Sequence, residues 1–203
     1  MSQTNAIKHQ LKLTDASAIL QAEAGELVLL LGVTGSGKTT WLKRLAHLAD
    51  MPKGLSLEAG EPVRMSFDQQ PPIWLGQNVG EELCFGLKRQ PELETLMACL
   101  QQWGLPELGL SSELKGLNRL QAIRLTLAGM ALAKPALVLL DAPTDALSVE
   151  TATILCKEIS DWATDSNTIV VVASNRWHDW QPVASQIWVT SSVNELPQVK
   201  DNI

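Results

Sequence analysis

The sequence predicts an α/β fold with a largely parallel sheet as its core and an inserted helical subdomain. Continuous aliphatic runs at Leu27–Leu31, Ala136–Leu140 and Thr168–Ala173 are typical of parallel strands buried on both faces. A long, mostly helical block, Val79–Lys134, separates the first two runs. Strands and helices therefore alternate along the chain, interrupted once by helices alone, which favours an α/β domain.

These patterns predict a single domain of 203 residues. Its core α/β lobe is expected to comprise residues 1–78 and 135–203, and its helical subdomain residues 79–134. The remaining expected elements are inferred from apolar periodicity and from turn residues. They are strands at Ala18–Ala22, Leu55–Leu57, Pro62–Phe67 and Gln186–Thr190, and helices at Thr39–Ala49, Glu92–Trp103, Asn118–Ala133 and Val149–Thr164.

Composition excludes several classes of protein. The formal charge of −6 argues against a nucleic-acid partner, which favours a basic face. The aliphatic runs are too short to span a bilayer, and the N-terminus lacks a signal-peptide pattern. The three cysteines have no metal-ligand spacing, which suggests buried thiols in a reducing compartment.

The strongest chemical signal is the run Gly32-Val33-Thr34-Gly35-Ser36-Gly37-Lys38-Thr39, a P-loop between an aliphatic strand and a helix. Its glycines let backbone N–H groups turn toward phosphate oxygens, and the helix N-terminus favours the same anions. Lys38 is expected to reach the β- and γ-phosphates, and the Thr39 hydroxyl to hold Mg²⁺. The expected nucleotide-binding residues are Gly32, Thr34, Gly35, Ser36, Gly37, Lys38, Thr39 and Thr40.

Asp141 is the second signal. It ends the aliphatic strand that contains Leu137-Val138-Leu139-Leu140. In P-loop proteins, an Asp at this position orients Mg²⁺ or its water. A strand-end Asp alone is weak, but together with the P-loop it predicts a Mg²⁺–nucleotide site in a P-loop NTPase fold.

With these motifs the chain resembles the nucleotide-binding subunit of an ATP-binding cassette (ABC) transporter. The resemblance runs from about Ala18 to Thr190. Gln69-Gln70-Pro71 resembles the family's Q-loop, which makes Gln69 a further candidate for positioning Mg²⁺ or water. The stretch from Val79 to Leu87 resembles the segment after the Q-loop in many family members, and the stretch from Leu139 to Ser148 resembles the Walker B and D-loop run.

The family's signature sequence, LSGGQ, falls on Leu117-Asn118-Arg119-Leu120-Gln121, where only the outer residues are retained. In the family, this segment of one subunit closes on the γ-phosphate held by another. A glycine there allows close backbone approach, whereas Leu120 adds bulk.

Other catalytic positions of the family are also changed. The glutamate that comes after the Walker B Asp falls on Ala142, and the switch histidine on Asn175. The D-loop Asp falls on Ser148, and His178 aligns with a helical residue, so it does not replace the switch. The family's adenine-stacking aromatic residue has no counterpart in the first forty residues, where His9 is the one candidate. No catalytic residue is therefore assigned, apart from the positioning role open to Gln69.

The resemblance implies a degenerate subunit that binds ATP and Mg²⁺ with impaired hydrolysis. It also implies a second ABC-type ATP-binding subunit, identical or different, and a separate transmembrane subunit. The chain itself is then expected to be cytoplasmic and peripheral on the inner face of the cell membrane. The apolar stretch Pro71-Pro72-Ile73-Trp74-Leu75 suits docking of that subunit, although Trp74 folded back on the helical subdomain fits equally well. The alternatives are a non-hydrolysing regulatory or structural subunit of a membrane complex, a small-molecule kinase, and a DNA-repair or chromosome protein.

Overall fold

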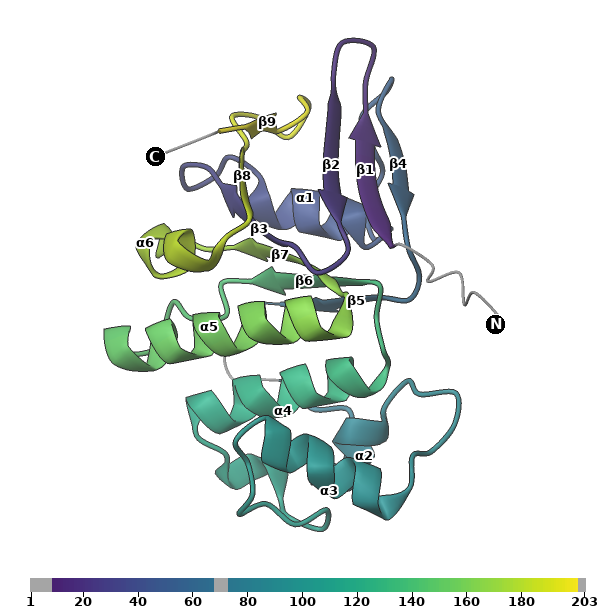
Figure 1. The fold of residues 1–203 in the computed structure, drawn as a ribbon, viewed down its shortest axis with the longest axis vertical. Coiled ribbons are helices and arrows are strands. Elements are labelled where there is room, and N and C mark those ends of the chain that lie inside the picture. Colours follow the sequence, from purple (N-terminus) through teal and green to yellow (C-terminus); the bar gives the residue numbers. More distant parts are fainter. Residues whose placement is uncertain (1–8, 68–72, 201–203) are drawn as a thin grey trace, which may run out of the picture. The chain divides into compact units, whose positions relative to one another are not determined.

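A computed structural model describes residues 9–67 and 73–200 and divides the chain into two compact units. The first unit comprises Met1–Met65 with Ala136–Ile203, and the second comprises Ser66–Pro135. Figure 1 shows sheets with helices in the first unit and helices in the second. The expected α/β fold with a mostly parallel sheet is confirmed.

A six-stranded sheet forms the centre of the first unit. In spatial order its strands are β5 (Val63–Ser66), β6 (Leu137–Asp141), β7 (Ile169–Ala173), β3 (Leu27–Leu31), β8 (Gln186–Val189) and β9 (Gln198–Val199). β7 pairs in parallel with β3 and β6, β8 pairs in parallel with β3, and β9 pairs antiparallel to β8. The two innermost strands, β3 and β7, are buried at every residue because neighbouring elements cover both faces.

A second, antiparallel sheet has the order β2 (Ile19–Glu23), β1 (Gln10–Thr14) and β4 (Ser56–Ala59). β1 is absent from the sequence prediction, although Leu11 and Leu13 alternate with polar residues as in a half-buried strand. The hairpin turn between β1 and β2 is closed by Asp15, whose carboxylate accepts hydrogen bonds from the backbone N–H groups of Ser17 and Ala18. The Ser17 N–H is the main cause that lowers the pKa of Asp15.

The first unit also holds α1 (Lys38–Leu45), α5 (Val149–Ser166), α6 (Trp177–Trp180) and the short 3₁₀ helix η2 (Gln181–Val183). The prediction that the first of these helices continues to Ala49 is wrong. His47 adopts a left-handed conformation with φ 57°, and its N–H donates to the Arg44 carbonyl, so the chain turns away from the helix. The apolar face of α1, with Trp41, joins the hydrophobic core of this unit.

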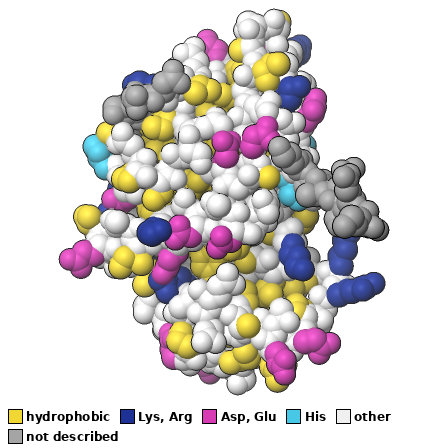
Figure 2. All heavy atoms as spheres, viewed as in Figure 1, with side chains coloured by type: hydrophobic (Ala, Val, Ile, Leu, Met, Phe, Trp, Pro, Cys, Tyr) yellow, Lys and Arg dark blue, Asp and Glu magenta, His cyan; other side chains and the backbone are white. Residues whose placement is uncertain are grey.

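The second unit contains α2 (Val79–Cys84), α3 (Leu93–Gln102), the 3₁₀ helix η1 (Leu114–Gly116) and α4 (Arg119–Leu132). Leu83, Leu100 and Leu125 are fully buried within it. A capping box begins α4: the Asn118 side chain accepts from the Gln121 N–H, and the Gln121 side chain accepts from the Asn118 N–H, both at 2.9 Å. On the face of the molecule drawn in Figure 2, acidic and basic side chains are interspersed.

Burial distinguishes the three cysteines from one another. Cys156 is fully buried and Cys99 is 8% exposed, while Cys84 is half-buried. Burial raises the pKa of Cys99 to about 11 and that of Cys156 to about 12. The Cys84 pKa is also raised by burial.

Alkylation of the native protein at pH 8 is therefore expected to modify Cys84 first. Cys99 and Cys156 are expected to react only after unfolding, because both access and the thiolate fraction are low in the native state. Iodoacetamide labelling followed by peptide mass spectrometry measures each site. Equal labelling of all three thiols in the folded protein would contradict this burial pattern.

Candidate functional site

The P-loop connects the end of β3 to the start of α1. Gly35 and Gly37 both have left-handed backbone conformations, with φ 84° and 93°, which glycine adopts without a steric cost. The Ser36 N–H donates to the Val33 carbonyl at 3.0 Å and closes the turn. Val33 is 78% exposed, so the outer part of the loop is open to a ligand.

Close packing explains two of the glycines. A Cβ atom on Gly32 would lie 2.2 Å from Ser36 Oγ and 2.6 Å from the Thr190 carbonyl oxygen. A Cβ atom on Gly37 would overlap the side chain of Val193. Only glycine therefore lets the loop lie against the chain that continues from β8.

The interior of the loop suits an anion. Lys38 Nζ donates to the Gly32 carbonyl at 2.8 Å, so the ammonium group is held across the loop. Ser36 is 6% exposed, and its Oγ has no hydrogen-bond partner among the described residues. The first turn of α1 carries no acidic side chain that would repel a phosphate from the helix N-terminus.

Thr39 and Asp141 meet at the carboxyl end of the parallel sheet. The Thr39 hydroxyl donates to Asp141 Oδ2 at 2.8 Å, across 102 residues of sequence. Thr39 is exposed and Asp141 is half-buried. A hydroxyl and a carboxylate are oxygen ligands of the kind that Mg²⁺ takes in nucleotide sites.

Ala142 comes directly after Asp141, at the position where the family pattern has a glutamate. Its side chain is only a methyl group. It is 7% exposed, and its backbone is left-handed with φ 49°. Its N–H donates to the Ala173 carbonyl at 2.8 Å, which continues the pairing of β6 and β7 by one residue. The described site therefore has no proton acceptor at this position.

Asn175 lies at the same edge, two residues beyond β7. It is exposed, and its amide Nδ2 donates to Asp145 Oδ2 at 3.2 Å. Asp145 is a residue that the sequence reasoning missed. Its neighbour Thr144 is fully buried, and Trp180 Nε1 donates to the Thr144 hydroxyl at 3.0 Å.

Arg176 was also missed, and it holds the turn from Ala142 to Ser148. Its guanidinium donates to the carbonyl oxygens of Thr144 and Leu147 and forms an ion pair with Asp179 at 2.9 Å. The sequence signal for Asp145 and Arg176 is the polar run Ser174-Asn175-Arg176 after a buried strand. That run does not reveal which residues it contacts.

Several other candidate positions have structural partners. Ser148 caps α5 by accepting from the Thr151 N–H, and His178 stacks on Trp177 within α6. Asn118 and Gln121 form the capping box of α4, in the second unit. The half-buried His9 lies against Gly60.

The remaining P-loop candidates differ in exposure. Thr34 is exposed and Thr40 is half-buried. Gln69, the candidate for positioning Mg²⁺ or water, lies outside the described residues.

Substitution of Gly32 by Ala is expected to destabilise the fold by about 1–3 kcal/mol, because the new Cβ would displace Ser36 and the backbone at Thr190. Gly116→Ala is the matched control, since a Cβ there meets nothing within 4 Å. Its expected effect is within about 0.5 kcal/mol. Urea unfolding of the two variants and the wild type gives the comparison; equal stability of both variants would refute the packing argument.

Residues 16–145 match the family model described as ABC transporter. Among curated relatives, an aliphatic sulfonates import ATP-binding protein of Mycobacterium avium is 34% identical over 136 residues, which cover 65% of this chain and 53% of the relative. A zinc import ATP-binding protein of Jannaschia sp. is 30% identical over 165 residues, covering 78% of this chain and 65% of the relative. The chain thus spans between about half and two thirds of the length of these relatives.

The fold is also similar to that of a solved structure. The structure of cbiO1 from Clostridium perfringens, part of the ABC transporter complex cbiONQ, superposes with a TM-score of 0.79 at 16% identity. The superposition covers 96% of this chain and 89% of that one. Because the family model matches well over half of the residues, and because the P-loop and Asp141 stand together at the sheet edge, the chain belongs to the ABC transporter family.

Proposed function

We propose that this chain is the ATP-binding subunit of an ABC-type membrane transporter, and that it binds Mg-ATP but hydrolyses it slowly. The observation that carries the proposal is the Thr39–Asp141 hydrogen bond beside a P-loop that Lys38 spans. Thr39 and Asp141 would supply the protein oxygens for Mg²⁺, and the remaining ligands would be phosphate and water oxygens. Lys38 and the N-terminus of α1 would hold the phosphates.

Slow hydrolysis is inferred from the side chains beside this site. A general base typically contributes roughly 10²–10⁴-fold to a rate, and the Ala142 methyl group accepts no proton. Asn175 is a neutral amide that is already bound to Asp145. The chain's residues therefore bind and orient the nucleotide, whereas position 142 offers no group that could activate the attacking water.

A membrane role is proposed from the family and from the two named relatives, both of which are import ATP-binding proteins. No helix within the described ranges is long and apolar enough to cross a bilayer. Transport would thus use a separate transmembrane subunit, together with a second ABC-type ATP-binding subunit, identical or different. A non-hydrolysing regulatory or structural subunit is the second candidate, favoured specifically by Ala142 and by the altered stretch Leu117–Gln121.

The second unit offers a surface for the transmembrane partner. Trp74 is half-buried and lines a cavity of about 540 Å³ with Leu114, Leu117 and Ala122. The side chains on either side of it, Ile73 and Leu75, are 67% and 61% exposed. Gln77, Glu113 and Lys115 also line this cavity, so an amphipathic helix of a membrane subunit would fit it and could contact the exposed Ile73 and Leu75.

Purified protein is expected to bind Mg-ATP, and Lys38→Ala is expected to abolish binding because it removes the cation from the loop. Turnover is expected below the ordinary enzyme range of about 1–10³ s⁻¹. Titration calorimetry measures binding, and a coupled phosphate-release assay measures turnover. Turnover within the ordinary range, abolished by Lys38→Ala, would refute slow hydrolysis.

The paired variants Ala142→Glu and Ala142→Gln sharpen that experiment. Both add a side chain of the same shape, but only the glutamate can accept a proton. Turnover is expected to rise about tenfold or more for Ala142→Glu relative to Ala142→Gln. Equal turnover of the two would mean that the missing base is not what limits hydrolysis.

Docking is expected to be lost in Trp74→Glu and in Leu75→Glu, because each replaces an apolar side chain of the proposed docking surface with a charged one. Co-purification with membranes from the native host measures it. Ile19→Glu is the control, since Ile19 is comparably exposed, at 60%, but lies in the first unit. Equal membrane recovery of all folded variants would count against docking at this surface.

A further inference from the structure

Asp145 accepts three hydrogen bonds from the segment that follows β7. Its Oδ1 accepts from the Ser174 hydroxyl at 2.7 Å, and its Oδ2 accepts from the Asn175 backbone N–H at 3.4 Å and from Asn175 Nδ2 at 3.2 Å. Ser174 is 3% exposed, whereas Asn175 is exposed. The carboxylate therefore joins a buried hydroxyl to an exposed amide.

This geometry decides which way the Asn175 amide points. An ionised carboxylate only accepts hydrogen bonds, so the NH₂ end of the amide must face Asp145. The opposite end of the amide, the carbonyl Oδ1, has no hydrogen-bond partner in the described part of the chain. Asn175 thus presents a fixed acceptor toward solvent.

The sheet register places the backbone of Asn175 at the P-loop end of the sheet. Ala173 is paired with Leu30 of β3 and with Asp141 of β6, and neighbouring strands lie about 4.8 Å apart. Asn175 comes two residues later, at the edge where the P-loop begins and where Asp141 meets Thr39. Ligands of parallel α/β sheets bind outside this edge.

We propose that Asp145 is a positioning residue that fixes the Asn175 carbonyl oxygen toward the terminal phosphate of the bound nucleotide, and that the pair thereby weakens the preference for ATP over ADP. The inference rests on the proposed nucleotide binding. A carbonyl oxygen accepts a hydrogen bond from water but repels a phosphate oxygen, which is itself an acceptor. ADP lacks the terminal phosphate and is not affected.

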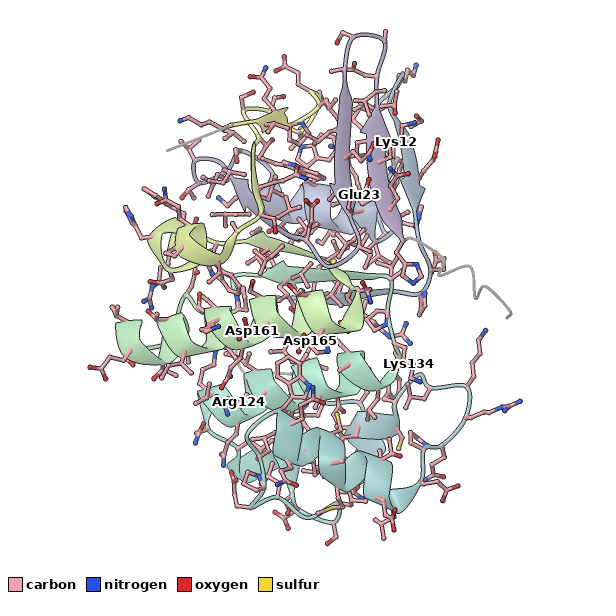
Figure 3. The ribbon with its side chains drawn as sticks, in the orientation of Figure 1. Lys12, Glu23, Arg124, Lys134, Asp161 and Asp165 are labelled. Atoms are coloured by element: carbon pink, nitrogen blue, oxygen red, sulfur yellow. The ribbon has the colours of Figure 1, made fainter. Side chains whose placement is uncertain are left out.

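The test compares dissociation constants for Mg-ATP and Mg-ADP, measured by titration calorimetry. Asp145→Ala frees the amide to turn its NH₂ group toward the terminal phosphate. The ratio of the ADP to the ATP dissociation constant is expected to rise about tenfold, the size of one hydrogen bond to a charged group. Asp161→Ala, the control, removes an acidic side chain from the exposed face of α5 and should leave the ratio unchanged (Figure 3).

A double-mutant cycle separates positioning from a purely structural role. Asn175→Ala removes the carbonyl oxygen itself and is expected to raise the ratio about twofold or more, and adding Asp145→Ala should then change nothing further. An unchanged ratio in folded Asp145→Ala, or an equal rise on both backgrounds, overturns the inference. If Asp145→Ala does not fold, an unchanged ratio in Asn175→Ala overturns it.

Different results would contradict the proposed function and the positioning role of Asp145. Wild-type protein that binds neither ATP nor ADP overturns the proposed function, and this inference with it. Wild-type protein that binds both, with variants that leave the ratio unchanged, overturns the positioning role of Asp145 alone.

Discussion

The parallel pairing of β7 with β3 on one side and β6 on the other is the constraint on which the candidate site depends. Because Ala173 is level with both Leu30 and Asp141, the P-loop, the Walker B carboxylate and the chain after β7 all emerge at one sheet edge. A slip of one residue in either pairing would turn each side chain to the opposite face of the sheet. The short Thr39–Asp141 hydrogen bond is therefore a consequence of register as much as of the two side chains.

Side chains from the segment after β7 hold the turn after Asp141, in addition to the turn's own backbone hydrogen bonds. Arg176 donates to two of its carbonyl oxygens, and Trp180 donates to the buried Thr144 hydroxyl. The Arg176 side chain is only 25% exposed, so loss of these two acceptors would leave guanidinium N–H groups without partners at a cost of about 1–3 kcal/mol, although the ion pair with Asp179 would remain. Side-chain hydrogen bonds consequently tie the turn to the segment after β7, beside the candidate site.

Sequence reasoning predicted the features that depend on local pattern. The aliphatic runs predicted β3, β6 and β7, and the glycine spacing predicted the loop that precedes α1. It failed where tertiary packing decides, as at the end of α1 near His47 and in the partners of Asp145, which lie about 30 residues away in sequence. β1 was missed because a few alternating residues near a polar N-terminus give a weak signal.

The positions at which the chain departs from its family have taken up structural roles. Asn118, together with the retained Gln121, caps α4, and Ser148 caps α5. A cap of this kind contributes about 1 kcal/mol. The signature glycines fall on Arg119 and Leu120, in the first turn of α4, where each glycine would cost up to about 1 kcal/mol of helix stability as well as remove side-chain bulk. Helix stability and the signature glycines thus oppose each other at Arg119 and Leu120, whereas Gly32 and Gly37 of the P-loop are required by packing. That difference gives a physical reason why the P-loop glycines are retained in this chain while the signature glycines are not.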